Sequence, residues 1–332
     1  MARTVRFHEH GGPEVLRLED VPVGEPGPGE LRIRVDAIGL NRAEALFRSG
    51  TYIEPVKEFP ARLGTEAAGV VEAVGAGVTG FEVGRPVSVV PAFSMNDYGV
   101  YAERAIVPAA AVLHRPDVLD AVGGAAVWMP YLTAYGALVE VGGMRAGDTV
   151  VLTAASSSVG LAAIQIANRV GATPIATTRT RAKAERLRAA GAAEVIVTSE
   201  EDVTGRVLDL TGGRGAEFVF DAVAGPGVVD LARALAPGGT LLLYGYLSGA
   251  ATPYPPLEIM RRRNMRAYTV HETSGDPERL RRAEAFIVSG LRGGAFQPTV
   301  DRVFGFDEIA EAHRYLEAGG QVGKIVVTVD HR

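Results

Sequence analysis

Residues 153–172 read TAASSSVGLAAIQIANRVGA, and the preceding Val150-Val151-Leu152 form a short apolar run that is typical of a buried strand. A turn that binds a dinucleotide between a strand and a helix needs small residues, because its backbone bends tightly and approaches a pyrophosphate. Serine and alanine fill this turn, and its glycine is Gly160. Serine hydroxyls donate to phosphate oxygens, and a helix N-terminus adds N–H donors. An ordinary serine-capped helix is the alternative explanation.

The segment after the next strand, IATTRTRAKAERL (175–187), distinguishes two cofactors. Proteins that bind NAD place an acid about 20 residues after the turn, where it accepts from the ribose 2′-hydroxyl. The first acid in this segment is Glu185, and hydroxyl and basic side chains precede it. Because guanidinium and hydroxyl groups bind a 2′-phosphate that a carboxylate would repel, the segment favours NADP(H). The cofactor residues predicted in the turn and in this segment are Ser157, Ser158, Val159, Gly160, Thr178, Arg179, Thr180 and Lys183.

Strand-like runs alternate with helix-like segments from about residue 125. The first such segment carries Val159, Ala163, Ile166 and Val170 at helical spacing. This alternation predicts a parallel sheet with right-handed crossovers. A helix is expected over roughly 306–318, before a final strand. The predicted strands are Val150–Leu152, Ile175–Thr177, Val195–Val197, Phe218–Phe220, Leu241–Tyr244 and Lys324–Val329.

The first third of the chain is predicted to be rich in strands. Leu31, Ile33 and Val35 alternate with polar residues at a period of two, and glycine and proline separate the short apolar runs. Residues 69–90 show the same pattern of short apolar runs separated by glycine and proline. We interpret this part as an antiparallel, barrel-like domain.

Composition limits the possible functions. The 332 residues include 47% hydrophobic and 22% charged residues, so two packed domains are expected. A net charge of −5 gives no general attraction to nucleic acid or to an anionic membrane. The chain contains no cysteine, which excludes disulfides and thiolate zinc sites. With neither a signal peptide nor an apolar stretch of about 18 residues, we expect a cytoplasmic protein and no membrane span.

Four further motifs accompany the turn in one order along the chain. They are NRAEALFRSGTY (41–52), LGTEAAGVVEAVGAGVTGFEVGRPVSVV (63–90), YLTAYGAL (131–138) and GKIVVTV (323–329). Together they resemble the medium-chain dehydrogenase/reductase superfamily, and within it the zinc-independent quinone oxidoreductase (zeta-crystallin-like) branch. The resemblance implies an α/β fold in which a doubly wound parallel Rossmann sheet is inserted into a β-rich, GroES-like barrel domain. It implies a catalytic domain over 1–125 and 270–332 and an NADP(H)-binding domain over 126–269.

The resemblance also indicates whether this chain has the ligands for a zinc ion. Zinc-dependent members carry a ligand cysteine where this chain has Asn41, and a ligand histidine where it has Thr65, followed here by Glu66. An amide and a hydroxyl do not build a stable tetrahedral zinc site, so no metal site is predicted. Without such a Lewis acid, oxidation of an alcohol loses its main electrostatic support.

The resemblance implies roles for several residues. Asn41, Tyr52 and Thr133 are similar to positions that line the nicotinamide and substrate cleft, and Asn41 and Thr133 would bind a developing oxyanion. Tyr52 resembles the proton donor of enoyl-thioester reductases, with simple packing as the alternative. The further cofactor residues that the resemblance implies are Gly245, Tyr246, His271, Gly323 and Lys324.

The predicted function is an NADPH-dependent oxidoreductase that delivers hydride to quinones or activated α,β-unsaturated carbonyl compounds. The alternatives are an enoyl-thioester or 2-alkenal double-bond reductase, and a non-catalytic NADPH- or RNA-binding protein of the same fold. The RNA alternative rests on the basic run Arg261–Arg266, which a solvated helix end also explains. Its lack of interleaved aromatic residues disfavours nucleic acid as a partner. The resemblance further implies a homodimer through an edge strand, here Met265–Val270.

Overall fold

A computed structural model describes residues 1–331 and divides the chain into two compact units, which are Met1–Met129 with Pro298–Arg332, and Pro130–Gln297. The second unit therefore extends beyond residue 269, where the sequence prediction ended it. The reason is helix α10 (Pro277–Arg292), which packs within the second unit. Its Phe286 ring lies 4.9 Å from the ring of Tyr135. Sequence periodicity identifies such a helix but does not reveal which core it joins.

The first unit is rich in strands, as its alternating apolar pattern predicted, and it is built on two sheets that are antiparallel except where β15 pairs with β16. A three-stranded antiparallel sheet has the order β2-β1-β4, and a larger sheet has the order β15-β16-β3-β5-β6-β8, with β7 also pairing β3. Leu31, Ile33 and Val35 of β3 are fully buried in the core of this unit. The strands are β1 (Ala2–Phe7), β2 (Arg17–Val21), β3 (Glu30–Gly39), β4 (Ala61–Arg62), β5 (Ala67–Val74), β6 (Pro86–Val89), β7 (Arg104–Pro108), β8 (Val112–His114), β15 (Val300–Gly305) and β16 (Lys324–Thr328).

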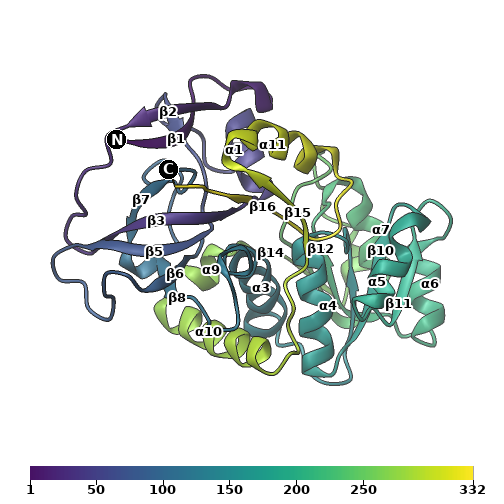
Figure 1. The fold of residues 1–332 in the computed structure, drawn as a ribbon. Coiled ribbons are helices and arrows are strands. Elements are labelled where there is room, and N and C mark those ends of the chain that lie inside the picture. Colours follow the sequence, from purple (N-terminus) through teal and green to yellow (C-terminus); the bar gives the residue numbers. More distant parts are fainter. Residues whose placement is uncertain (332) are drawn as a thin grey trace. The chain divides into compact units, whose positions relative to one another are not determined.

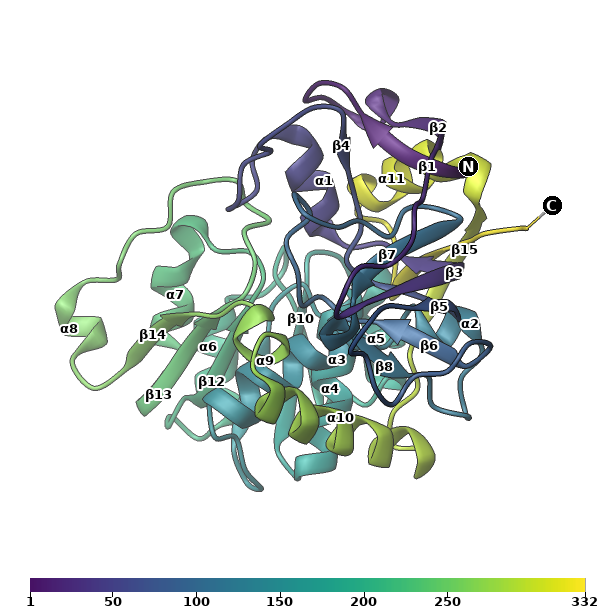
Figure 2. The ribbon, with the colours of Figure 1, turned by 90° about the vertical axis from the view of Figure 1, so that its left-hand side faces the viewer.

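Helices α1 (Arg42–Ser49) and α11 (Ile309–Ala318) of the first unit lie side by side in both views (Figures 1 and 2). The buried Arg48 of α1 donates to His313 of α11 at 2.9 Å and pairs with Glu317 at 2.7 Å. These contacts join segments from the two ends of the chain. The other helical segments here are η1 (Pro13–Val15), η2 (Ala109–Ala111), α2 (Ala121–Gly124) and η6 (Phe306–Glu308).

The second unit contains a six-stranded parallel sheet of order β11-β10-β9-β12-β13-β14. Chain order reverses between β9 and β12, and such a reversal opens a crevice at the carboxyl ends of the two strands, where ligands bind in this class of sheet. All five strands predicted here are present. Four have somewhat longer bounds, and the fifth begins earlier than predicted but ends at Leu243, one residue before the predicted end. Figure 2 shows β14 at one edge of the sheet, beside β13. The strands are β9 (Thr149–Leu152), β10 (Thr173–Thr178), β11 (Glu194–Val197), β12 (Ala216–Asp221), β13 (Leu235–Leu243) and β14 (Asn264–Ala267).

Helix α4 (Ser158–Val170) follows β9 as predicted, but its buried face differs from the predicted stripe. Ala163 and Ile166 of that stripe are fully buried, but Val159 and Val170 are only half-buried, and Leu161, Ile164 and Ala167 are buried as well. The helix is turned so that its small residues approach the sheet. The other helical segments are α3 (Trp128–Tyr135), η3 (Gly136–Val141), η4 (Arg181–Lys183), α5 (Ala184–Ala189), α6 (Val203–Leu210), η5 (Gly225–Gly227), α7 (Val228–Arg233), α8 (Leu257–Met260) and α9 (His271–Ser274).

One helical stretch, Ala121–Val141, is long and apolar enough to cross a membrane by length and composition alone. Inside the protein, 78% of its most apolar window is buried. Burial of that extent is typical of a helix in a protein core.

Candidate active site

The turn between β9 and α4 has the geometry of a phosphate-binding turn. Ser157 caps α4, and its hydroxyl oxygen accepts from the backbone N–H of Gly160 at 3.1 Å. A Cβ at position 160 would lie 2.5 Å from Ala155 Cα, so only glycine lets the helix approach the strand this closely. Ala154 has a φ of 45°, which bends the chain sharply at the strand end. Gly160, which the sequence predicted as a cofactor residue, thus lets the first turn of α4 pack closely against the loop after β9.

A buried acid at the end of β12 ties this turn to its neighbour. Asp221, which is fully buried, accepts from the Thr153 hydroxyl at 2.5 Å and from the backbone N–H of Ala224 at 2.8 Å. Thr153 Oγ1 in turn accepts from the N–H of Ala222 at 2.9 Å. Ala224 holds a strained backbone with φ 57° and ψ −155°. The loops after β9 and β12 are therefore fixed to each other where chain order reverses.

Hydroxyl and basic groups occupy the end of β10. Thr178 is buried, and its hydroxyl donates to the carbonyl of Thr180 at 3.3 Å. The Lys183 ammonium donates to Ser156 Oγ at 3.3 Å, so a cation lies at the serine-rich turn. Arg179 is exposed and makes no ion pair with the described residues. Arg181, by contrast, pairs with Glu200.

The remaining residues predicted in the second unit lie near the carboxyl edge of the sheet or on helices. Gly245 and Tyr246 lie two and three residues after the end of β13, and Tyr246 is 42% exposed. His271 begins α9, and Thr133 is buried within α3. The sequence placed these four residues at the cofactor or its reacting end, which stays a prediction.

The first unit contains a buried polar cluster that includes Asn41, Glu66 and Lys324. The Lys324 ammonium donates to Asn41 Oδ1 and to Glu66 Oε2, each at 2.5 Å. The side chains of Lys324 and Glu66 are 1% and 0% exposed. Glu44 completes the cluster, because its carboxylate accepts from the Asn41 backbone N–H at 2.8 Å and from the Thr65 hydroxyl at 3.2 Å. Strand β3, α1, the segment after β4 and the start of β16 all meet at this point.

Burial changes the protonation of this cluster. Removal from water raises the pKa of Glu44 to about 7, and the positive charge of Lys324 opposes this rise. Burial also raises the pKa of Tyr52 to about 12, with a further contribution from the negative charges of Glu44 and Glu54. Tyr52 therefore keeps its proton at neutral pH. Its hydroxyl forms no hydrogen bond with the described residues, and its ring packs edge-on against Phe47 at 6.2 Å.

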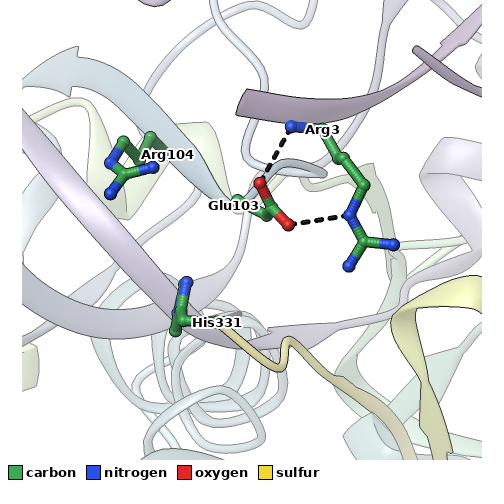
Figure 3. A pocket seen from close by; sticks show the side chains of 4 residues that line it. All are labelled: Arg3, Glu103, Arg104 and His331. Atoms are coloured by element: carbon green, nitrogen blue, oxygen red, sulfur yellow. Dashed lines mark hydrogen bonds and ion pairs between the residues drawn. The ribbon is translucent and has the colours of Figure 1, made fainter. Parts of the chain in front are cut away.

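A separate pocket of about 260 Å³ opens elsewhere in the first unit, and Arg3, Glu103, Arg104 and His331 line it (Figure 3). Its charges are largely paired, because Arg3 Nε donates to Glu103 at 2.7 Å and Arg104 Nε donates to Glu72 at 2.8 Å. None of the residues predicted from the sequence lines this pocket. We assign it no part in the reaction.

Comparison with known proteins agrees with this architecture. The alcohol dehydrogenase GroES-like domain matches residues 27–117, and the zinc-binding dehydrogenase family matches residues 158–289. A quinone oxidoreductase of Pseudomonas aeruginosa is 35% identical over 98% of this chain and 99% of its own length. The chain belongs to the quinone oxidoreductase branch of the medium-chain dehydrogenases/reductases.

Other members of this branch extend the comparison. A 2-haloacrylate reductase of a Burkholderia species is 32% identical over 98% of this chain and 99% of its own length. The crystal structure of Escherichia coli quinone oxidoreductase in complex with NADPH superimposes with a TM-score of 0.91 at 28% identity, covering 98% of this chain and 99% of that one.

The zinc named in one of these family descriptions does not fit this member of the branch. No group of three or more His, Cys, Asp or Glu side chains in residues 1–331 is arranged to hold a metal ion. Asn41 and Thr65, which the family resemblance matches to zinc ligands, bond to the Glu44 carboxylate, and Asn41 also bonds to Lys324. A buried ammonium beside these groups repels a divalent cation.

Three residues of the candidate site were not predicted from the sequence. Glu44 lies three residues after Asn41, and that spacing is a helix-capping signal that was open to recognition. Asp221 directly follows an apolar strand run, which also marks an acid at the carboxyl edge of a sheet. No pattern in the sequence marks Thr153, because its role is to donate a hydrogen bond to Asp221, which is 68 residues away.

Proposed function

We propose that this chain is an NADPH-dependent oxidoreductase that transfers hydride to quinones or to α,β-unsaturated carbonyl compounds. The observation that carries the proposal is the Lys183 ammonium at the serine-rich turn, 3.3 Å from Ser156, on a segment where NAD-binding proteins place an acid. The names of the relatives support it, since they include quinone oxidoreductases and one of these was crystallised with NADPH.

The residues of the second unit fit such a nucleotide. The N-terminus of α4 presents backbone N–H donors and partial positive charge to a pyrophosphate. Lys183 and Arg179, with the hydroxyls of Thr178 and Thr180, supply the donors that a 2′-phosphate requires. Bound NADPH supplies the hydride. Gly245, Tyr246, His271 and Gly323 are proposed to contact the cofactor, as the family resemblance implies.

The residues proposed for the acceptor are Asn41, Thr133 and Tyr52. Quinones and enones carry their own electron sink, so the protein needs only to orient them and to hydrogen-bond the oxygen on which negative charge develops. Asn41 and Thr133 are proposed as these donors. Tyr52 keeps its proton at neutral pH, because burial raises its pKa, and it is proposed to donate this proton to the substrate.

The cofactor proposal is tested by replacing the two proposed phosphate ligands. Arg179→Gln combined with Lys183→Gln removes two charged contacts, and we expect the preference for NADPH over NADH to fall by about 10-fold or more. Steady-state kinetics with both cofactors measures this ratio. Arg186→Gln, at an exposed basic residue on α5, is the matched control. A wild-type protein that prefers NADH would refute the assignment.

Reduction of an activated carbon–carbon double bond is the second candidate function. It is favoured by the Tyr52 hydroxyl, which no described residue engages, and by the 2-haloacrylate reductase among the relatives. With NADPH bound, a hydride would add to the β-carbon of the acceptor, and the Tyr52 hydroxyl would donate its proton to the α-carbon. Tyr52→Phe should lower turnover of an enone by about 10²-fold or more, yet change quinone reduction less. Equal rates for the variant and the wild type would leave Tyr52 as a packing residue.

Assembly and location complete the proposal. Strand β14 pairs only with β13 among the described residues, so its outer edge is open to a second copy, and we propose a homodimer there. Light scattering of the purified protein tests this state. A chain without cysteine suits a reducing compartment, and we place the protein in the cytoplasm.

The RNA alternative gains no support from the basic run. Arg263 donates to the carbonyls of Leu235 and Ile259 at 2.8 and 2.7 Å, and Arg266 pairs with Glu272. These two arginines are engaged within the fold, which leaves Arg261 and Arg262 as the exposed cations of the run. Filter binding at two salt concentrations should therefore show no salt-sensitive retention of single-stranded RNA.

A further inference from the structure

We propose that Lys324 is a positioning residue that orients and polarises the side-chain amide of Asn41. The inference rests on the proposed function, in which Asn41 donates to the developing oxyanion of the acceptor. The sequence assigned Lys324 to the cofactor, but the structure directs its ammonium to Asn41 Oδ1 and Glu66 Oε2, 2.5 Å from each. Asn41 itself is 9% exposed.

The ammonium determines which way the Asn41 amide points. An ammonium has N–H donors and no acceptor, so the Asn41 atom beside it must be the oxygen. The amide nitrogen then donates to the carbonyl of Gly39 at 3.1 Å, and that oxygen can only accept. Both contacts select the same orientation. A flipped amide would set its NH2 group against the ammonium and its oxygen against a carbonyl.

The amide keeps one weakly engaged N–H in this orientation. Besides Gly39, the oxygens near Asn41 Nδ2 are Glu66 Oε2 at 3.4 Å and Glu44 Oε1 at 3.5 Å, both at the long limit of a hydrogen bond. An ammonium bound to an amide oxygen draws electron density from the group and strengthens its N–H donors. Lys324 thus strengthens the donor that would meet the oxyanion.

The surroundings leave Lys324 little freedom. Glu66 holds the ammonium with one carboxylate oxygen, while the other accepts from the backbone N–H of Met129 at 2.7 Å. A Cβ at Gly39 would lie 2.9 Å from Lys324 Cε, so β3 passes against the lysine stem. A cation held this firmly is preorganised, as electrostatic catalysis requires.

Two variants separate this role from simple core stability. Lys324→Met removes the charge and retains much of the stem, but it leaves Glu66 without its cation. Glu66→Gln combined with Lys324→Met removes both charges, so no unpaired buried carboxylate remains. Lys57→Met, at an exposed lysine of the same unit, is the matched control. Each protein is tested for thermal unfolding, NADPH binding by fluorescence, and the single-turnover rate of NADPH oxidation with a benzoquinone and with an enone.

We expect the double variant to fold and to bind NADPH with wild-type affinity, while its hydride-transfer rate falls by about 10²-fold. The fall should be larger for the enone, because its enolate oxygen is more basic than that of a reduced quinone and depends more on the donor. A folded double variant with the wild-type rate would overturn the inference and leave the proposed function intact. A wild-type protein that binds NADPH but reduces neither acceptor would overturn both.

Discussion

The buried Glu44 should make the folding stability of the protein depend on pH. Burial raises its pKa to about 7 from the ordinary 4.5. Between these values the folded protein holds a proton that the unfolded chain has released, so stability must fall as pH rises. Glu44 therefore contributes stability that is fully present below about pH 4.5 and is lost as pH rises through about 7. A shift of this size corresponds to about 3 kcal/mol in total and to roughly 2.5 kcal/mol between pH 5 and pH 8.

His313 works in the opposite direction within the same unit. Burial, with the adjacent Arg48 charge, lowers its pKa to about 3 from 6.5. His313 stays neutral in the folded protein but gains a proton in the unfolded chain. Its contribution to folding stability is therefore present above about pH 6.5 and is lost as pH falls. The loss amounts to roughly 2 kcal/mol between pH 8 and pH 5. The two groups nearly cancel in the wild type over this range.

Glu44→Gln should remove the loss of stability that Glu44 causes as pH rises, while the effect of His313 remains. The side-chain oxygen that the variant retains still accepts from the Asn41 N–H, and the Thr65 hydroxyl can turn to accept from the new NH2 group. The remaining cost of the substitution therefore does not depend on pH. We expect the stability of the variant relative to wild type to rise by roughly 2.5 kcal/mol between pH 5 and pH 8.

The assay is urea unfolding at four pH values from about 5 to 8, the range over which the two pKa shifts act. Trp128, the single tryptophan of the chain, is fully buried at the start of α3, and its fluorescence reports unfolding around that helix. Glu82→Gln, at an exposed position of the same unit, is the control. Comparison with wild type at each pH cancels the other titrating groups. A stability difference that stays constant across the range would refute the argument from burial.

Two further predictions concern the loops of the second unit. Gly160→Ala places a Cβ 2.5 Å from Ala155, so it should destabilise this unit by roughly 1–3 kcal/mol and weaken NADPH binding. Thermal unfolding measures the first effect, and fluorescence titration measures the second. If both values are unchanged, the turn relaxes freely to accept the methyl group. Asp221→Asn replaces an oxygen that accepts from Thr153 or Ala224, which should lower the folding stability by roughly 1–3 kcal/mol. Amide hydrogen exchange at residues 222–225 should then become faster. Unaltered exchange would show that the loop does not depend on this acid.

Strands and turns were predictable from the sequence because their signals are local. Short apolar runs located all five predicted strands of the parallel sheet, and Gly160 was recognised by its place in the turn. The buried face of α4 was predicted in part, because Ala163 and Ile166 are fully buried while Val159 and Val170, which obey the same helical spacing, are only half-buried. Spacing alone does not show how wide the buried face is.

Long-range contacts explain what the sequence left out. Lys324 and Asn41 are 283 positions apart, and their contact depends on how β16 pairs with β3. Likewise, α10 joined the second unit through Phe286 and its aromatic neighbours, which no local pattern identifies. The protonation of Glu44 follows from burial, and burial is a property of the assembled core.

The charges around Asn41 form one coupled system. Two carboxylates and one ammonium lie within a core that excludes water, and the Lys324 charge favours ionised Glu44 while burial opposes it. With Glu44 protonated, the cluster reduces to the neutral pair of Glu66 and Lys324. Asn41, Thr65 and the buried Lys324 therefore belong to one hydrogen-bonded arrangement whose charges depend on one another.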